Sequence, residues 1–328
     1  MTSLRARLGR LRREVLGLNR RNHDFMIPFN PAPWVALVDN KLATKLALEP
    51  YGLALPRTFA TCLRPVELRR FVRLLQPLAE FVLKPARGAG GEGILVVAGR
   101  QDGVWRKTSG ERLTERDLLA HAADVMAGAF SLGQSHDHVF AEQRLVTHEA
   151  LQPFAFGGVP DIRVVVVFGV PLLAMVRLPT RQSDGRANLH LGGIGVGIDL
   201  ASGHACHAVW QGKGITHHPD QRTDLRSLTV PHWDALLFTA ARCFDAVPLG
   251  YFGVDIVVDR QLGPCILEIN ARPGLQIQLA NRRGLRPLLD AVCQRRPTDS
   301  ATAADRVALG VEIYRQVTRA DGRAETPP

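Results

Sequence analysis

Residues 253–258 read Gly-Val-Asp-Ile-Val-Val, and residues 265–274 read Cys-Ile-Leu-Glu-Ile-Asn-Ala-Arg-Pro-Gly. Each stretch is an apolar run typical of a buried strand, and polar side chains interrupt it at Asp255, Glu268 and Asn270. The segment between them contains Gly263-Pro264, which favours a hairpin turn. Because residues two apart on a strand face the same side, Glu268 and Asn270 project together, and pairing of the two strands brings Asp255 beside them.

These three side chains indicate a site for a hard cation. Two carboxylates and an amide oxygen, with no Cys or His among them, suit Mg²⁺ (or Mn²⁺) held together with the phosphates of a nucleotide. A plain hairpin whose acids face solvent explains the same residues, since a short motif match is only a hypothesis.

The composition is that of a globular protein large enough to bury a substantial core. The 328 residues are 46% hydrophobic and 22% charged. No apolar run approaches the roughly 20 residues that span a bilayer, and the basic N-terminus lacks the apolar region of a secretory signal. The five cysteines are scattered without CxxC spacing, so neither a disulfide framework nor a zinc site is indicated. We therefore expect a cytoplasmic protein.

The formal net charge of +10 comes almost entirely from arginine. The only lysines are Lys41, Lys45, Lys84, Lys107 and Lys213. Arginine makes planar, bidentate contacts to carboxylates and phosphates, which favours acidic ligands or anionic surfaces as partners. A bias of genome composition explains the excess equally well. Nucleic-acid binding has only the charge in its favour, because aromatic residues make up just 6% and form no interleaved platform.

Residues 4–18 have the pattern of a basic amphipathic helix. Apolar side chains recur at spacings of four and three, and arginines occupy the other faces; the stripe is Leu4, Leu8, Leu11, Val15 and Leu18. Such a helix can dock on an anionic membrane or on a partner. The commoner arrangement is a helix packed on its own domain with a solvated basic face. A Pro-rich segment around residues 28–33 is expected to be irregular.

The rest of the chain mixes helices and strands without regular βαβ alternation, which predicts an α+β fold. Asp39 is expected to cap a helix that runs to about Tyr51, and Thr114 with Asp117 forms a capping box for a helix to about Ala129. Further helices are expected after Pro65 and over 233–244, 285–294 and 307–317, and strands over 81–84, 94–97, 139–142, 162–168, 172–177 and 192–198. The tail to Pro328 is predicted to be disordered.

A glycine-rich loop follows the strand over 81–84. Residues 84–93 read Lys-Pro-Ala-Arg-Gly-Ala-Gly-Gly-Glu-Gly. Glycines let backbone N–H groups approach phosphates closely, and Lys84 supplies a point charge beside them. Because a strand rather than a helix follows, the loop is neither a Walker A loop nor a Rossmann fingerprint. Taken alone, a flexible turn explains it as well.

A second polar group surrounds the apolar hairpin over 162–177. Asp161-Ile162-Arg163 opens the hairpin, and its far end leads to Arg177, Arg181, Arg186, Asn188 and His190 before Gly192-Gly193. Arginine and asparagine clustered near glycine suit recognition of a phosphate or a carboxylate. Each of these arginines taken singly is more often a surface side chain.

The order and spacing of these motifs resemble the ATP-grasp superfamily. In chain order they are Asn40-Lys41, Leu55-Pro56, Lys84-Pro85 with its glycine loop, Glu142-Gln143, Asp161-Ile162-Arg163, residues 186–193, Gly253-Val254-Asp255 and residues 267–274. Within the superfamily the sequence is most similar to the alpha-L-glutamate ligases that add glutamates to a ribosomal protein, and above all to an alpha-L-glutamate ligase-like group. The resemblance covers residues 39–285.

The resemblance implies a role for each matching residue. Lys41 and Lys84 would hold the phosphates of ATP, and the loop containing Gly88, Gly90, Gly91 and Gly93 would fold over them. The hinge that pairs with adenine through its backbone would be Glu142, Gln143, Arg144 and Leu145, with Glu149 on the ribose. The Mg²⁺ (or Mn²⁺) ligands would be Asp255, Glu268 and Asn270. The catalytic residues around the γ-phosphate and the acceptor carboxylate would be Arg163, Arg186, Asn188 and Arg272.

The resemblance also implies an architecture and a reaction. Two α+β subdomains would clasp ATP, with a lead-in over 1–38, an ATP-grasp domain over 39–296 that includes an ATP-lid subdomain over 57–145, and a helix and tail over 297–328. The reaction would convert a carboxylate to an acyl phosphate, which an amine attacks to give an amide, ADP and phosphate. Glutamate or another amino acid would be attached to an amine or peptide acceptor.

A different class of function remains open, namely a nucleotide-binding regulatory or scaffold module. Such a module would dock a membrane or a protein partner through residues 1–22, and a homo-oligomer is compatible with either function.

Two departures from the glutamate ligases affect this interpretation. Those enzymes usually carry a substantial N-terminal α/β domain, whereas about 38 residues precede the first matching helix here, so the N-terminal domain is expected to be reduced and the amino-acid specificity is open. Asp39-Asn40-Lys41 also replaces an adjacent Asp-Lys pair. The distance to Pro56 favours Lys41 over Asp39 as the matching residue.

Overall fold

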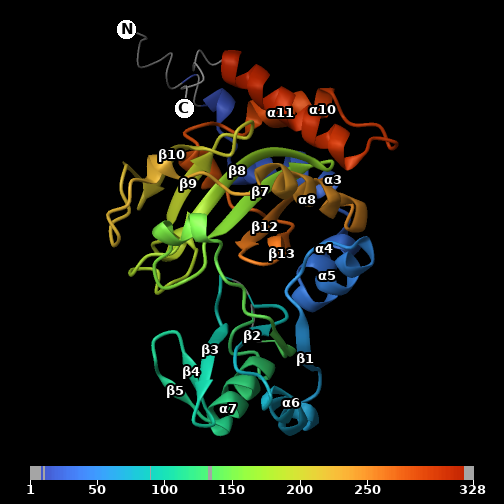
Figure 1. The fold of residues 1–328 in the computed structure, drawn as a ribbon. Coiled ribbons are helices and arrows are strands. Elements are labelled where there is room, and N and C mark those ends of the chain that lie inside the picture. Colours follow the sequence, from blue (N-terminus) through green and yellow to red (C-terminus); the bar gives the residue numbers. More distant parts are fainter. Residues whose placement is uncertain (1–8, 10–11, 89, 132–134, 321–328) are drawn as a thin grey trace.

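Two lobes, each built on an antiparallel sheet, make up the molecule (Figure 1). The structure is a computed structural model that describes residues 9, 12–88, 90–131 and 135–320. Helices pack against both sheets, and the strands of each sheet pair with their neighbours in antiparallel register. The α+β class predicted from the sequence is confirmed.

The smaller lobe contains a six-stranded sheet covered by two helices. Its strand order is β1 (Thr58–Cys62), β6 (Val139–Glu142), β2 (Phe81–Pro85), β3 (Leu95–Gln101), β4 (Val104–Lys107) and β5 (Arg112–Leu113). A 3₁₀ turn (Pro65–Glu67) leads into α6 (Leu68–Leu75), and α7 (Glu115–Met126) is the second helix. Phe71 and Leu118 from these helices pack with Phe81 in one hydrophobic core. These strands lie within residues 57–145, the segment predicted to form the ATP-lid subdomain.

The predicted capping box of α7 is present in the smaller lobe. The Thr114 hydroxyl accepts from the Asp117 N–H, and the Asp117 carboxylate accepts from the Thr114 N–H. Each bond satisfies a donor that the helix itself leaves free. The helix ends at Met126, three residues before the predicted Ala129, because Gly128 adopts a φ of +87° that stops it.

The larger lobe contains a seven-stranded sheet whose central strands are buried. The strand order is β11 (Lys213–Ile215), β10 (Ala205–Trp210), β9 (Ile194–Ile198), β8 (Val170–Leu178), β7 (Asp161–Val167), β12 (Tyr251–Asp259) and β13 (Gly263–Asn270). The apolar runs of β7, β8 and β12 are buried along their length, as such runs demand. The predicted hairpins β7–β8 and β12–β13 are both confirmed.

Helices from the second half of the chain pack on this larger sheet. They are α8 (Trp233–Ala246), α9 (Ile277–Ala280), α10 (Arg286–Gln294) and α11 (Ala303–Ala320), with short 3₁₀ turns at Glu149–Phe154, Leu189–Leu191 and Leu225–Ser227. Both α8 and α10 match predicted helices, and α11 extends beyond the predicted 307–317 at both ends. The predicted disordered tail beyond Ala320 lies outside the described residues. None of the described helices is long and apolar enough to cross a membrane.

The N-terminal part of the chain differs from the prediction. Described helical residues reach Glu14, but residues 15–17 are not helical, so the helix predicted over 4–18 ends early; residues 1–8, 10 and 11 lie outside the description. Leu16 is 1% exposed, whereas the predicted stripe residues Val15 and Leu18 are 44% and 61% exposed. The side chain that packs on the core is therefore Leu16, which is not part of the predicted apolar stripe.

The Pro-rich segment predicted to be irregular is mostly helical. It contains most of α3 (Ile27–Phe29) and the start of α4 (Ala32–Val38), and it follows α2 (Leu18–Arg20) and a π-helical stretch (Arg21–Met26). Pro33 occupies the first turn of α4, where the missing N–H has no helical partner to lose, whereas Pro28 lies in α3, which continues directly from the π-helical stretch. The next helix is α5 (Lys41–Leu48), followed by a 3₁₀ turn (Glu49–Tyr51). The predicted cap at Asp39 is wrong, because the Asn40 side chain accepts from the Leu42 and Ala43 N–H groups instead.

Candidate functional site

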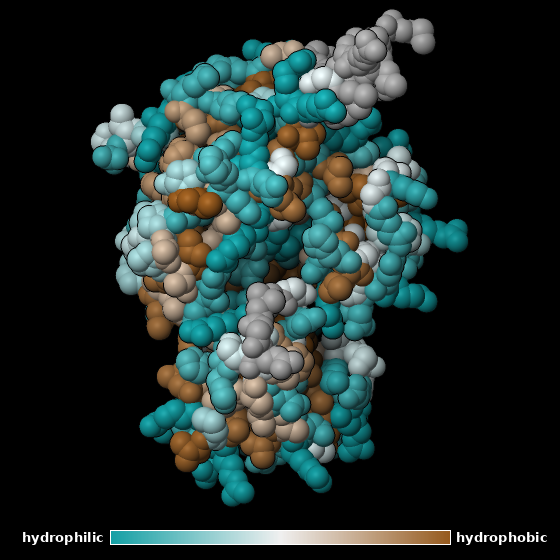
Figure 2. Space-filling model, turned by 180° about the vertical axis from the view of Figure 1, so that it is seen from behind, coloured by the Kyte–Doolittle hydropathy of each residue, from teal (hydrophilic) through white to brown (hydrophobic). Residues whose placement is uncertain are grey.

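The two lobes face each other across a cleft of about 1280 Å³. Seen from behind, the surface is hollowed between the lobes, and hydrophilic side chains rim the hollow (Figure 2). Every predicted site residue lines this cleft except Gly93 and Glu149. Residues far apart in the sequence, from Lys41 to Arg272, therefore meet at one place.

The floor of the cleft is one face of the larger sheet. Asp161 and Arg163 lie two residues apart on β7 and so face the same side. Asp161 pairs with Arg177 of β8, Arg163 pairs with Asp255 of β12, and Asp255 pairs with Glu268 of β13. The register shifts between Asp255 and Ile256, which sets Glu268 and Asn270 opposite Asp255 and Gly253. A bulge of this kind re-aims side chains at a site.

Four charged side chains on this floor form a buried network. The Arg163 guanidinium donates to both Asp255 oxygens, with Nε–Oδ1 of 2.7 Å and Nη2–Oδ2 of 2.6 Å. Arg177 Nη2 donates to Asp255 Oδ2 at 2.6 Å, and Arg177 also donates twice to Asp161. The two acids thus neutralise the two guanidinium groups inside the fold, as buried charges require.

The network separates the pKa values of its two acids. Burial raises the pKa of Asp161 to about 6, and the nearby Asp255 adds to the rise while Arg177 opposes it. Burial acts on Asp255 in the same direction, but Arg163 and Arg177 outweigh it and hold the pKa of that carboxyl well below its usual range. Asp255 therefore stays ionised between its two arginines.

The donor chemistry at β12 and β13 fits a hard cation. Glu268 is partly exposed to the cleft and lies 3.5 Å from Lys41 Nζ, while Asn270 Oδ1 accepts from the Arg272 N–H at 2.8 Å. Both Asp255 oxygens are engaged by guanidinium groups. No cluster of three or more acids, cysteines or histidines with metal-binding spacing occurs in the described part of the chain. Glu268 and Asn270 thus fit a cation shared with phosphates, as Mg²⁺ prefers, rather than an all-protein cage.

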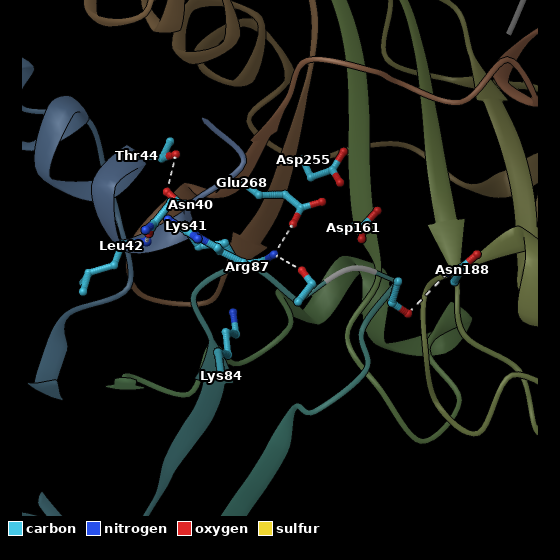
Figure 3. Close-up of polar contacts among 12 residues, drawn as sticks. Asn40, Lys41, Leu42, Thr44, Lys84, Arg87, Asp161, Asn188, Asp255 and Glu268 are labelled. Atoms are coloured by element: carbon cyan, nitrogen blue, oxygen red, sulfur yellow. Dashed lines mark hydrogen bonds and ion pairs between the residues drawn. The ribbon is translucent and has the colours of Figure 1, made fainter. Parts of the chain in front are cut away.

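Lys41 ties together elements of both lobes (Figure 3). Its ammonium group donates to the Gly88 carbonyl oxygen at 2.5 Å and lies 3.5 Å from Glu268 Oε2. Its backbone N–H donates to the Ala86 carbonyl at 2.7 Å, which fixes the start of α5 against the glycine loop. One lysine therefore joins α5, the glycine loop and the strand that carries the predicted metal ligands.

The glycine loop also meets the loop that follows β8. Asn188 Nδ2 donates to the Gly90 carbonyl at 3.4 Å, as Figure 3 shows. Gly91 lies against Arg186, since a Cβ atom built on Gly91 would be 3.7 Å from Arg186 Cδ. The two glycines have φ angles of +67° and +83°, which favour residues without a side chain. The loop predicted to cover phosphates thus reaches across to Arg186 and Asn188.

A buried triad of Lys45, Glu142 and Lys84 lies at the smaller lobe's side of the cleft. Lys45 Nζ donates to Glu142 Oε2 at 2.6 Å, and Lys84 forms a second ion pair with Glu142. Burial alone would raise the pKa of Glu142, but the two ammonium groups lower it below the usual value. Burial lowers the pKa of Lys45 even though Glu142 opposes the change.

This triad changes the interpretation of two predicted residues. The Glu142 side chain forms ion pairs with two lysines, whereas a hinge residue was expected to act only through its backbone, by pairing with adenine. Lys84 carries an ion pair of its own, whereas the sequence placed it simply against the glycine loop. Lys45 was missed, and the signal that pointed to it was the scarcity of lysine in this sequence. Leu145 packs with Val257 and Cys265 and supplies an apolar wall beside the triad.

The structure places two predicted residues apart from the lining of the cleft. Glu149 is an exposed residue at the start of a 3₁₀ turn. Gly93 has a φ of +71°, and a Cβ atom there would lie 2.7 Å from the Phe130 ring. Gly93 therefore holds the base of the glycine loop against α7's C-terminal extension and does not face the cleft.

Two further cleft residues, Asp161 and Arg177, complete the charged floor. The sequence placed them in the polar group at the two ends of the predicted hairpin, but the resemblance gave neither of them a role. Asp39, which the sequence suggested as a helix cap, instead pairs with Arg272 through Oδ1–Nη1 of 2.7 Å. That pair links α4's C-terminal end to the turn after β13.

A model of a known protein family matches most of the chain. The family is described as sugar-transfer associated ATP-grasp, and its model matches residues 20–294. The match confirms the predicted resemblance to the ATP-grasp superfamily and the predicted fold. The family's description differs from that of the glutamate ligase-like group, so the placement in that group stays a prediction. No curated protein shows significant similarity to the chain.

Solved structures of ligases also resemble the chain. The ATP-grasp ligase PsnB complexed with its minimal precursor is 18% identical over 81% of this chain and 64% of that chain, with a TM-score of 0.43. The D-alanine–D-alanine ligase from Coxiella burnetii is 14% identical over 89% of this chain and 63% of that chain, with a TM-score of 0.46. The chain therefore spans less than two thirds of the length of these structures.

Proposed function

Because the chain belongs to the family of sugar-transfer associated ATP-grasp proteins, we propose that it is an ATP- and Mg²⁺-dependent carboxylate–amine ligase. The observation that carries the proposal is the position of Lys41, whose ammonium group joins the glycine loop to Glu268. A phosphate chain bound there would lie between backbone N–H groups, a cation and hard-oxygen ligands. These are the groups that phosphoryl transfer requires.

The proposed reaction has two steps. An oxygen of the carboxylate substrate attacks the γ-phosphorus of ATP, the bond to the β-phosphate oxygen breaks, and ADP leaves. The amine nitrogen then attacks the acyl carbon, the bond to the phosphate oxygen breaks, and an amide, phosphate and one proton result. Mg²⁺ held by Glu268 and Asn270 would neutralise negative charge on the phosphates during the transfer.

The chain's own residues would position both substrates. Lys41 and the backbone of the glycine loop would hold the phosphates, while Lys45 and Lys84 around Glu142 keep positive charge at the smaller lobe's side. Arg163 and Arg177 fix Asp255 in its ionised form at the floor of the cleft. Catalysis of this kind rests on positioning and on electrostatic stabilisation of the transferring group.

Arg186 is our candidate for binding the carboxylate substrate. It lines the cleft, is exposed, and has no carboxylate partner among the residues that the structure describes. The other lining arginines each lie within ion-pair distance of an acid, namely Arg144, Arg163, Arg177, Arg181 and Arg272. A free guanidinium beside the glycine loop suits an incoming carboxylate through two parallel hydrogen bonds.

The substrate class within this reaction is an amino acid or a peptide, with glutamate first. The family description adds sugars that carry an amine or a carboxylate as candidates for the panel. The test is ADP and phosphate release by the full chain, with Mg²⁺ and ATP, across glutamate, other amino acids, short peptides, amino sugars and uronic acids. ADP formation that requires both an acid and an amine supports the ligase. ATP binding without ADP formation on any pair favours the regulatory or scaffold module.

A further inference from the structure

The turn that follows β13 carries two residues of the proposed site. Asn270 ends the strand, and Arg272 lines the cleft and donates its N–H to Asn270 Oδ1 at 2.8 Å. The strand ladder stops at the pair Gly253–Asn270. Beyond it, the carbonyl groups of Ala271 and Pro273 have no strand partner, although both residues are buried. Buried carbonyls need a hydrogen-bond donor from elsewhere in the chain.

Arg21 supplies one of these donors from the N-terminal part of the chain. Its Nη1 donates to the Pro273 carbonyl at 2.9 Å, and its other nitrogens donate to Asn22 Oδ1. Arg21 is 8% exposed, and no carboxylate pairs with it among the described residues. A buried guanidinium held only by neutral oxygens is costly, so its bond to the turn calls for an explanation beyond stability.

Two further observations connect Arg21 with the floor of the cleft. It begins a π-helical stretch, an element that occurs often at functional sites. The Tyr251 hydroxyl is buried without a hydrogen-bond partner, and the charges of Arg21 and Arg163 both act on it. Tyr251 and Asp255 lie four residues apart on β12 and so share a face, which places the charge of Arg21 near the start of the face that carries Asp255.

Asn30 supplies the second donor to the turn. Its Nδ2 donates to the Ala271 carbonyl at 3.3 Å and to the Tyr251 carbonyl at 2.7 Å, while its Oδ1 accepts from the Tyr251 N–H at 2.9 Å. The side chain therefore replaces a missing strand neighbour for β12 and continues to the turn. The Phe29 carbonyl accepts from the Gly250 N–H at 2.8 Å, which fixes Asn30 in place.

We propose that Arg21 and Asn30 are positioning residues for the turn at 271–274, and that they set the position of Arg272 at the substrate side of the cleft. This rests on the proposed function for its catalytic consequence. The two side chains act through backbone carbonyls, and Arg272 and Asn270 are the groups that would touch substrate or cation. Because the turn would act on the nucleotide through the cation at Asn270, binding of ADP without Mg²⁺ is expected to be independent of Arg21.

The test compares Arg21→Gln with Arg20→Gln in the full chain. Arg20 is the matched control, because it is the preceding residue, carries the same charge and is half exposed beside Asp24. Hydrogen exchange is measured on the peptide that covers residues 270–276, in which the Arg272 amide reports directly on the bond to Asn270. Loss of one charged hydrogen bond predicts about tenfold faster exchange there in Arg21→Gln and no change in Arg20→Gln.

Kinetics supply the second readout. Arg21→Gln is expected to lower the kcat of ADP formation about tenfold while the Kd of ADP measured without Mg²⁺ changes less than twofold, and Arg21→Lys is expected to recover part of the loss because it keeps one donor. Equal exchange in Arg21→Gln and Arg20→Gln would overturn the proposal, and so would faster exchange with an unchanged kcat.

The exchange measurement does not depend on the ligase activity, so the two proposals fail separately. A wild-type chain that forms no ADP with any substrate pair would contradict the proposed function alone. If Arg21→Gln does not fold, Asn30→Asp takes its place, since it keeps the acceptor for the Tyr251 N–H and removes the donor to the Ala271 and Tyr251 carbonyls. Unchanged exchange at residues 270–276 in Asn30→Asp would likewise overturn the proposal.

Discussion

Whether a charged side chain in the cleft can bind a ligand depends on the ion pairs that it already makes with its neighbours. Glu268 has a loose contact to Lys41 at 3.5 Å, whereas both oxygens of Asp255 are bound by arginines. Glu142 is bound by two lysines. The same residue type therefore serves as an accessible ligand at one position and as an internal counter-ion at another.

The first prediction concerns Glu268. Replacement Glu268→Gln removes a negative charge and one strong oxygen ligand for Mg²⁺, so we expect ADP formation to fall below detection while the fold is kept. Glu49→Gln, on an exposed turn outside the cleft, is the control and should retain full activity. Steady-state ADP release with a thermal melt of each variant is the measurement. Wild-type turnover in Glu268→Gln would refute the metal assignment.

The second prediction compares three lysines. Lys84→Ala and Lys45→Ala each leave Glu142 with one cation, whereas Lys213 is an exposed residue of β11. A charge-assisted bond is worth about 1.5–3 kcal/mol, so Mg·ADP binding should weaken about tenfold or more in the first two variants and stay unchanged in Lys213→Ala. Lys107 is unsuitable as a control, because it lines the cleft. Equal affinities in all three calorimetric titrations would count against a role of the Lys45–Glu142–Lys84 triad in nucleotide binding.

The third prediction concerns Asp161, whose pKa burial raises to about 6 from a usual value of 3.8. The folded state then binds a proton more tightly than the unfolded chain, so the stability contributed by this group is present below pH 4 and is lost as the pH rises to 6. The loss is on the order of 3 kcal/mol at most, at 1.36 kcal/mol per pKa unit. Urea unfolding of wild type and Asp161→Asn at pH 4 to 7 measures it. A constant difference between the two proteins across this range would show that Asp161 does not titrate there.

At the scale of the elements, hairpin geometry and loop conformation place the site. The register shift in β12–β13 decides which side chains of β13 stand opposite Asp255. The glycine loop depends on positive φ angles at Gly90, Gly91 and Gly93 to cross from β2 to β3. Both features concern the path of the backbone, and a change in either moves several site residues together.

The fourth prediction compares two glycines of the smaller lobe, Gly93 and Gly103. Gly93→Ala adopts an unfavourable φ and also brings its Cβ to 2.7 Å from Phe130, whereas Gly103 has a similar φ of +77° with nothing within 4 Å. Gly93→Ala should therefore destabilise the protein by about 1–3 kcal/mol more than Gly103→Ala, through overpacking against the ring. Urea unfolding checks the difference, and Mg·ADP titration shows whether the loop is displaced. Equal free energies of unfolding for the two variants would mean that the Phe130 ring moves aside without a loss of stability.

For the whole molecule, the N-terminal part of the chain is an integral layer of the larger lobe. Leu16 is buried, its N–H donates to Gln278 Oε1 at 2.8 Å, and its carbonyl accepts from Gln278 Nε2 at 3.0 Å. Asn30 and Arg21 continue the contact along β12 and the turn after β13. These described residues pack on the chain's own core, which is the arrangement that the sequence analysis gave as the commoner one. Docking of a membrane or a partner by the basic N-terminal helix stays a prediction.

The fifth prediction tests this docking. Leu16→Ala should cost about 2–4 kcal/mol of stability, as for other buried leucines, whereas Leu18→Ala at an exposed position should change it by less than about 0.5 kcal/mol. Deletion of residues 1–22 should then lower the melting temperature, because it removes Leu16 and Arg21 together. Equal melting temperatures for the two point variants would contradict core docking. Salt-sensitive binding to anionic vesicles that is lost on deletion would support the membrane alternative.

The sequence by itself determined the hairpins, their α+β setting and most members of the site. Short-range patterns carry these features, since alternation along β12 and β13 fixes which residues share a face, and Thr114 with Asp117 fixes a helix start. The strands β1, β4, β5, β10 and β11 escaped prediction because they are short or alternate with partly exposed positions.

Only the tertiary structure decided which charges are free and which are paired. The pairs Arg163–Asp255, Lys45–Glu142 and Arg272–Asp39 join residues 92, 97 and 233 positions apart. Such contacts follow from the register of neighbouring strands and from the approach of the two lobes, and no local pattern encodes them. The same holds for Arg21, whose hydrogen bond to the Pro273 carbonyl joins residues 252 positions apart. The sequence determines which chemical groups each residue carries, and tertiary packing determines whether those groups are already bonded to a neighbour.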